Sequence, residues 1–233
     1  ALYSNTTGEY NTAISELALY SNLSGDHNVA IGRCTLKENI GGCYNTAIGL
    51  HALKSNTTGC GNIAIGQTYG GALCKNTTGY DNVAFGGMFN NTTGYGNFAA
   101  GYNSLASNTT GYWNNGFGPY ALKSNTTGGD NTAIGYQALG LNTTGGHNTA
   151  VGRCALYSNI SGVYNAAIGM HSLKCNTTGC HNAAIGSNAL GSNTEGHGNT
   201  AIGSSALVCN TTGEHNTAIG NLALQCTTTG GYN

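Results

Sequence analysis

Eleven regularly spaced asparagines stand two residues before a threonine or serine, and this Asn-x-Ser/Thr arrangement is the acceptor signal for attaching a sugar to an asparagine amide. One interpretation of the pattern is a chain coated with covalent glycans. The alternative is structural, because an asparagine side chain can also close a tight turn by bonding to the backbone, here a turn leading into a glycine such as Gly8. The candidate acceptors are Asn5, Asn22, Asn56, Asn76, Asn91, Asn108, Asn125, Asn142, Asn159, Asn176 and Asn210.

A second set of asparagines is almost always followed, two residues later, by alanine, and therefore carries no acceptor signal. We expect these side chains to form an internal ladder of amides, each bonded to the one above it, which would fix the register of a flat strand. The ladder asparagines are Asn11, Asn28, Asn45, Asn62, Asn82, Asn97, Asn114, Asn131, Asn148, Asn165, Asn182, Asn199, Asn216 and Asn233.

The nine cysteines offer disulfide chemistry. Cys43 and Cys60 hold equivalent places in successive repeats, as do Cys209 and Cys226, while Cys175 and Cys180 flank one turn. Each pair could form a bridge if repeats stack about 4.8 Å apart, and disulfides would favour an oxidising, extracellular setting. The alternative is a set of small buried thiols in a reduced protein.

Catalysis and metal binding find no support in the sequence. The eight acidic residues are scattered, and no Ser–His–acid group or carboxylate pair recurs. Four histidines share one place in the repeat but not in adjacent repeats, which argues against a chain of metal sites. We therefore predict no enzyme activity and no cofactor, apart from covalent glycans.

Charge and hydropathy exclude two partner classes. A net charge of −1 gives no electrostatic basis for binding nucleic acid, and no apolar run is long enough to span a membrane.

Aromatic residues gather in the two variable positions that follow each Asn-Thr-Thr-Gly phrase. Such side chains on a regular scaffold could form a recognition stripe for a glycan or a host surface, at Tyr80, Tyr95, Tyr112 and Trp113. The alternative is a solvent-facing turn whose composition drifts.

These residues must be positioned by a 17-residue repeat that runs through the chain, residues 1–233, as one array. Three residues are inserted near 67–71 and two are missing near 86–90, both just after the Ala-Ile-Gly phrase. Short apolar segments between two glycine corners predict an all-β fold, a β-solenoid or parallel β-roll of about 14 coils. Each coil has room for one or two aliphatic side chains. We expect the array to be a segment of a longer chain.

The Asn-Thr-Ala-Ile-Gly strand also predicts self-association. Neighbouring strand residues point to opposite faces, yet the Ala13 and Ile14 positions stay apolar in repeat after repeat. One face can line the lumen of the coil, and the other would need a second chain, most simply in a parallel homotrimer. The alternative is a monomer whose alanine column lines a flat exposed face.

Phrases such as "NTAIGYQAL" and "NVAIGRCTL" resemble the YadA-like head repeats of trimeric autotransporter adhesins and, more closely, the NTAIG/NTTG arrays of phage tail-fibre-like surface fibre proteins. The resemblance covers essentially the whole chain. It implies a left-handed parallel β-roll used as a stalk or binding head at a cell or virion surface. The repeat here is longer than the adhesin-head unit and adds the NTTG phrase, so the fold carries over better than the mode of attachment.

The sequence therefore predicts an extracellular structural fibre segment, a shaft or stalk that associates with itself as a homotrimer or end to end. The alternatives are a module that binds surface glycans through the variable stripe, or a glycan-coated filament. An ice-binding face is a weaker hypothesis, because Thr6 and Thr7 are adjacent and would point in opposite directions.

Overall fold

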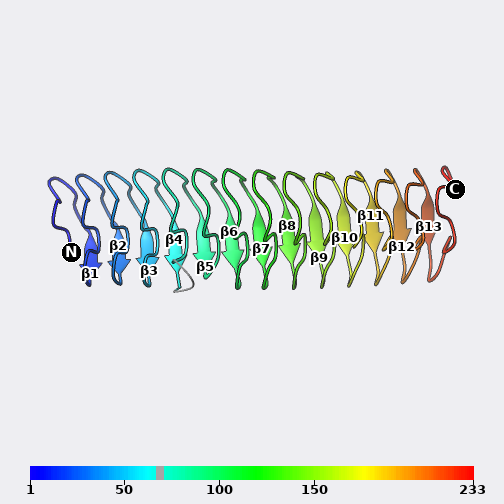
Figure 1. The fold of residues 1–233 in the computed structure, drawn as a ribbon, viewed down its shortest axis with the longest axis horizontal. Helices are drawn as coiled ribbons and strands as arrows, with labels where there is room; N and C mark the ends of the chain where they lie inside the picture. The colour runs from blue at the N-terminus through cyan, green and yellow to red at the C-terminus, as the bar shows by residue number, and fades with distance from the viewer. Residues whose placement is uncertain (67–70) are drawn as a thin grey trace. The chain divides into compact units, whose positions relative to one another are not determined.

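The computed structural model describes residues 1–66 and 71–233, which form two compact units, Ala1–Trp113 and Asn114–Asn233. Each unit is a β-solenoid in which every coil contributes one short strand (Figure 1). The described residues contain no helix, as expected of an all-β chain. The first unit holds β1 (Thr12–Ile14), β2 (Val29–Ile31), β3 (Thr46–Ile48), β4 (Ile63–Ile65), β5 (Val83–Phe85) and β6 (Phe98–Ala100).

The second unit holds seven strands of the same length. They are β7 (Asn115–Phe117), β8 (Thr132–Ile134), β9 (Thr149–Val151), β10 (Ala166–Ile168), β11 (Ala183–Ile185), β12 (Thr200–Ile202) and β13 (Thr217–Ile219).

Within each unit, consecutive strands pair in parallel and in register. Thr12 pairs with Val29, 17 positions further along the chain, and the same interval recurs at most pairs. Val83 instead lies 20 positions after its partner Ile63, and Phe98 lies 15 positions after Val83. The three-residue insertion itself falls largely on residues 67–70, outside the described residues. The strand pairing therefore continues in register across both changes of length.

The core of each coil is narrow, as the length of the repeat predicts. One leucine, with Met88 once in its place, is fully buried in nearly every coil, beside a buried alanine at the middle of the strand. Two asparagines complete the interior of most coils. The alternative in which the alanine column forms a flat exposed face is therefore wrong. The fully buried large side chains are Leu19, Leu36, Leu53, Leu73, Met88, Leu105, Leu122, Leu139, Leu156, Leu173, Leu190 and Leu207.

The outer face of the strands carries an apolar column, at the last residue of each strand, that is only partly covered, beside a column at the first residue that is threonine in many coils. Ile168 and Ile185 are each 43% exposed, whereas Ala167 and Ala184 between the outward positions are fully buried. This follows from the alternation of side chains along a strand. In a single chain the strand is thus buried on one face, and the expectation of burial on both faces is not met within one copy.

Close stacking requires glycine at both corners of the coil, and at one corner the backbone conformation requires it as well. Gly25 precedes the variable turn, and a Cβ there would lie 2.4 Å from the carbonyl oxygen of Gly42 in the next coil. Gly169, after β10, has a positive φ of 134°, and a Cβ there would lie 2.5 Å from the carbonyl oxygen of Gly186. A glycine with positive φ follows every described strand except β1, which Ser15 follows.

Left-handed backbone is not confined to glycine. The core leucines have φ between 45° and 52°, and two further positions in most coils, represented by His27 and His171, have φ of 55° and 60°. A left-handed conformation costs a side-chain-bearing residue roughly 1–2 kcal/mol. It persists where the surroundings over-determine it, and here the hydrogen bonds to the neighbouring coils do so.

Ser204 and Ser205 test this strain as a matched pair, because only Ser205 has a positive φ, 54°. Glycine tolerates that region, so we expect Ser205→Gly to raise the free energy of unfolding by about 1 kcal/mol. Ser204→Gly only adds freedom to the unfolded chain, and we expect it to be neutral or to lower stability by up to about 1 kcal/mol. Urea unfolding of both variants measures the difference, and equal effects would contradict the strain.

Candidate functional sites

The asparagines of the Asn-x-Ser/Thr column form a continuous side-chain ladder within each unit. The Asn22 Nδ2 group donates one hydrogen to the Asn5 Oδ1 of the preceding coil at 2.8 Å and the other to the Gly25 carbonyl at 3.0 Å. Asn142 repeats the pattern in the second unit, with Asn125 and Gly145 as acceptors. Both amide hydrogens are therefore used, and the side chains are buried from Asn22 onward.

The second asparagine column forms the amide ladder that the sequence predicts. The Asn28 Nδ2 and backbone N–H groups both donate to the Asn11 Oδ1, at 3.1 and 2.9 Å. The Asn11 Nδ2 group donates to the Gly25 carbonyl in the following coil, at 2.8 Å. Because Asn22 donates to the same carbonyl, one glycine oxygen per coil joins the two ladders.

Glycans on the Asn-x-Ser/Thr column would require its asparagine side chains to face outward, and the structure instead buries them from Asn22 onward. Asn39 and Asn193, whose following residues break the acceptor signal, occupy the ladder in the same way as the others. In interior coils with two threonines in the phrase, the second, such as Thr58, is exposed and the first, such as Thr57, is half-buried. A glycan would replace an amide hydrogen that the ladder uses and would have no space in the core, so the turn-forming alternative fits the geometry better.

The C-terminal end of this asparagine ladder leaves a buried acceptor without a donor. The Asn210 Oδ1 atom is buried and has no hydrogen-bond partner, because the equivalent place in the next coil is Thr227 rather than asparagine. A buried acceptor without a partner lowers stability by about 1–3 kcal/mol.

The variable stripe is a column of stacked rings. Tyr95 lies between Tyr80 and Tyr112, with ring centroids 4.8 and 5.5 Å apart, so both of its faces are covered by other rings. Trp113 stands edge-on to Tyr95 and Tyr112 and is 55% exposed. Among these four residues, only the indole of Trp113 combines high exposure with a ring plane turned out of the stack.

Histidines continue this stacking elsewhere in the same turn. His27 lies between Tyr10 and Tyr44, with ring centroids 4.8 and 4.9 Å apart. Tyr164 lies between His147 and His181 in the second unit. Aromatic character in this column thus stabilises contacts between coils, which the sequence reasoning did not anticipate.

All nine cysteines carry free thiols in the structure. The three expected disulfides, Cys43–Cys60, Cys209–Cys226 and Cys175–Cys180, are therefore not formed in it. The Cys43 backbone N–H donates instead to the Cys60 sulfur at 3.1 Å, which places these two side chains on successive coils as expected. Burial raises the pKa of the Cys74 thiol, with Lys75 acting in the opposite direction, so this thiol is a poor nucleophile.

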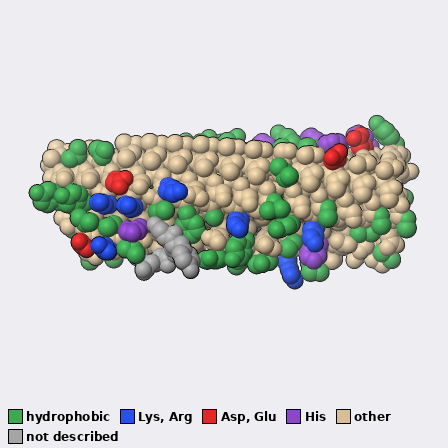
Figure 2. All heavy atoms as spheres, viewed as in Figure 1, with side chains coloured by type: hydrophobic (Ala, Val, Ile, Leu, Met, Phe, Trp, Pro, Cys, Tyr) green, Lys and Arg blue, Asp and Glu red, His purple; other side chains and the backbone are tan. Residues whose placement is uncertain are grey.

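Among residues 1–66 and 71–233, no group of three or more histidine, cysteine or acidic side chains is arranged to hold a metal ion. No helix in that part of the chain is long and apolar enough to cross a membrane. The face of the molecule drawn in Figure 2 is mostly uncharged. One exposed ion pair joins Arg33 to Glu16 at 3.0 Å.

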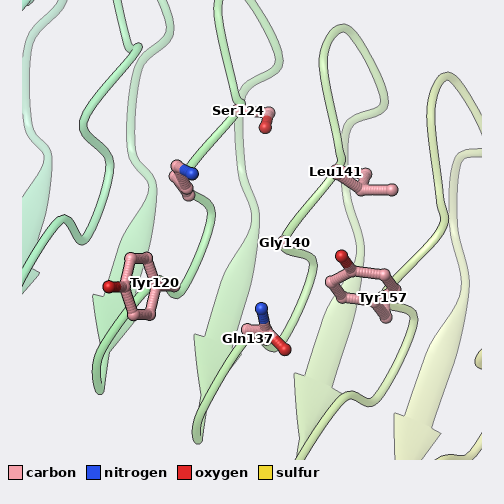
Figure 3. A pocket seen from close by; sticks show the side chains of 7 residues that line it. Tyr120, Ser124, Gln137, Gly140, Leu141 and Tyr157 are labelled. Carbon is pink, nitrogen blue, oxygen red and sulfur yellow. The ribbon is translucent and has the colours of Figure 1, made fainter.

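The second unit contains a small hollow of about 260 Å³, including its open mouth. Tyr120, Lys123 and Ser124 line one side, and Gln137, Gly140 and Tyr157 complete it with Leu141 (Figure 3). The sequence reasoning missed this hollow. Its signal was a glycine, Gly140, at a place in the repeat where the two neighbouring coils carry the longer side chains Lys123 and Tyr157.

Neither the scan against protein-family models nor the search of curated proteins finds a match to this chain. Its function is therefore inferred from the geometry above and from the repeat phrases.

Restoring the ladder at Thr227 should stabilise the protein. In Thr227→Asn the new Nδ2 group can donate to Asn210 Oδ1 and to the Gly230 carbonyl, as the equivalent asparagines do. We expect the free energy of unfolding to rise by about 1–2 kcal/mol. Thr228→Asn is the matched control, because Thr228 is next to Thr227 in the sequence but its side chain is exposed and lies outside the ladder. An equal effect of both substitutions in urea unfolding would show that the orphaned acceptor has no such role.

The burial of the acceptor asparagines predicts a bare chain. We expect the denatured intact mass of protein isolated from its natural source to be 23.6 kDa for this segment. A higher mass that falls on treatment with an N-glycosidase would contradict the burial of these amides.

Proposed function

We propose that this chain is a structural segment of an extracellular fibre, a shaft or stalk without enzymatic activity, whose copies associate side by side as a parallel homotrimer. The single observation that supports it most is the outer face of the strands. In each unit it carries an unbroken column of apolar side chains at the last strand position, beside a first strand position that is threonine in many coils, and the described side chains on it include no charged residue.

The two ladders support a role as a scaffold. Each coil is fixed to the next by amide hydrogen bonds of 2.7 to 3.2 Å in both columns, as at Asn39 and Asn165, in addition to the backbone pairing. A repeat held in this way keeps its register without a large core. Most of the chemistry of the repeat is thus committed to stacking coils, as suits a shaft.

The apolar face supports the lateral association. Isoleucines such as Ile134, Ile168 and Ile185 stay about two-fifths exposed along the second unit. Contiguous exposed apolar surface of this kind marks interaction sites in soluble proteins. A second copy of the same chain offers a surface with the same 17-residue interval, so its side chains can meet this face at every coil. The surface location at a cell or virion follows from the resemblance of the repeat phrases.

A second candidate function is recognition of a surface glycan through the variable stripe. Trp113 favours it, because an indole that is 55% exposed can receive a sugar ring, whereas Tyr95 has both faces covered. Binding on a glycan array that is lost in Trp113→Ala would support this role, and a silent array would favour the shaft alone.

Association through the apolar face predicts a native mass of three times 23.6 kDa. In the double variant Ile168→Lys/Ile185→Lys, buried charges at the interface should dissociate the assembly to single chains, since unpaired charges cannot be buried. Ile160→Lys is the control, because Ile160 is similarly exposed but lies in the turn. Native mass spectrometry and sedimentation measure the state. A single-chain mass for the unmodified protein would overturn the association, and a dimer would replace the trimer.

A further inference from the structure

Charges are segregated in the second unit. Its three basic residues, Lys123, Arg153 and Lys174, all lie in the turn between a strand and the next buried asparagine. Its three acidic residues, Asp130, Glu195 and Glu214, all lie at the opposite corner, at or after the Asn-Thr-Thr-Gly phrase. The turn after the strand is therefore a cationic surface in this unit, with no acidic residue in the same segment.

Two of these basic side chains, Lys174 and Arg153, act on the same residue, His171. Partial burial lowers the pKa of His171, and the positive charges of Lys174 and Arg153 lower it further. The His171 backbone N–H donates to the Arg153 carbonyl at 3.0 Å, so the two residues lie on successive coils. His171 thus stays neutral at pH 7, and the charge of the surface comes from the lysines and the arginine.

The hollow beside Lys123 lies within this surface. Gly140 forms its floor between the Lys123 and Tyr157 positions, and a Cβ on Gly140 would lie 3.0 Å from the Tyr157 ring atoms Cδ2 and Cε2. Figure 3 shows Tyr120 and Tyr157 on either side of Gln137 and Gly140, which come from the turns after β7, β8 and β9. The absence of one side chain therefore opens a gap one coil wide between two aromatic walls.

The lining combines an apolar wall with donors of different kinds. The Lys123 ammonium lies 5.5 Å from the centre of the Tyr120 ring, so it stands at the edge of the hollow. Cys154 Sγ contacts Gln137 Oε1 at 3.7 Å, which leaves the Gln137 Nε2 group as a donor. The Ser124 hydroxyl adds a group that can donate or accept.

We propose that this hollow binds one acidic sugar residue, a uronate, of an anionic glycan. The hollow is small and open to solvent, so a ligand can seat no more than a single ring in it. The Tyr157 ring contacts the apolar face of the sugar, Gln137 and Ser124 bond to its hydroxyls, and Lys123 binds its carboxylate through a charge-assisted hydrogen bond. Arg153 and Lys174 attract further acidic residues of the same glycan along the stack of coils.

The proposed sugar site goes beyond the shaft role and does not depend on it. The site is built from residues of the second unit alone, on the turn after the strand rather than on the apolar strand face. It also differs from the variable stripe, whose aromatic residues Tyr80 to Trp113 belong to the first unit.

The test measures binding of glucuronate, glucose and inorganic sulfate to the full chain by saturation-transfer or chemical-shift titration. We expect glucuronate to bind saturably and at least tenfold more tightly than glucose or sulfate, because only glucuronate supplies both the ring and the charge. Raising the salt from 0.05 to 0.5 M should weaken this binding several-fold. Equal affinity for sulfate would reduce the site to an unspecific anion patch, and equal affinity for glucose would remove the role of Lys123. Either result overturns the proposal.

Two variants locate the site. Gly140→Leu fills the hollow with a neutral side chain and should abolish glucuronate binding, whereas Gly191→Leu makes the same change three coils further on and should leave it unchanged. Lys123→Gln keeps the shape and should lower glucuronate affinity to that of glucose. Thermal unfolding establishes that the variants fold. Glucuronate binding retained in folded Gly140→Leu would show that the ligand does not occupy this hollow.

Discussion

One hydrogen-bonding constraint underlies the rest of this structure: each buried asparagine amide must use both of its hydrogens within its own 17-residue coil and the coils next to it. The ladders meet this constraint by sharing a glycine carbonyl, as Asn11 and Asn22 share that of Gly25. The same arrangement leaves no space for a Cβ on that glycine and none for a substituent on the amide. The recurring Asn-Thr-Thr-Gly phrase is therefore explained by the inside of the coil, although it has the form of a modification signal.

The backbone is shaped around a core that is too narrow to specify the fold by packing alone. Leucines such as Leu139 are buried with a left-handed φ of 50°, a conformation that a leucine rarely adopts. Backbone bonds such as that from the Leu139 N–H to the Ala155 carbonyl, at 3.0 Å, hold each such residue to the next coil. Stability therefore comes from repetition, since each coil is held in place by its neighbours.

The repeat interval, the parallel stacking and the Asn11-type ladder could all be predicted from the sequence, because periodicity states which residues are equivalent. The location of the Asn5-type side chains could not be predicted, since the sequence Asn-x-Ser/Thr is the same whether the asparagine amide faces water or the core. The left-handed leucines were hidden for a similar reason, because residue type normally argues against that conformation. The hollow at Gly140 depends on which neighbours a missing side chain would have touched, and only the stacked coils show these.

The hydrogen bonds between coils have a mechanical consequence. They run along the direction in which coils stack, as from the Val29 N–H to the Asn45 carbonyl, at 2.8 Å. Tension applied along that direction breaks the hydrogen bonds between coils one coil at a time. It does not load many of these bonds in shear at once. Each coil that peels away would release about 55–60 Å of slack chain. A single chain of this repeat is therefore extensible, and the force needed to unfold its coils one by one is low. In the proposed trimer, contacts along the strand face would add resistance to such a load.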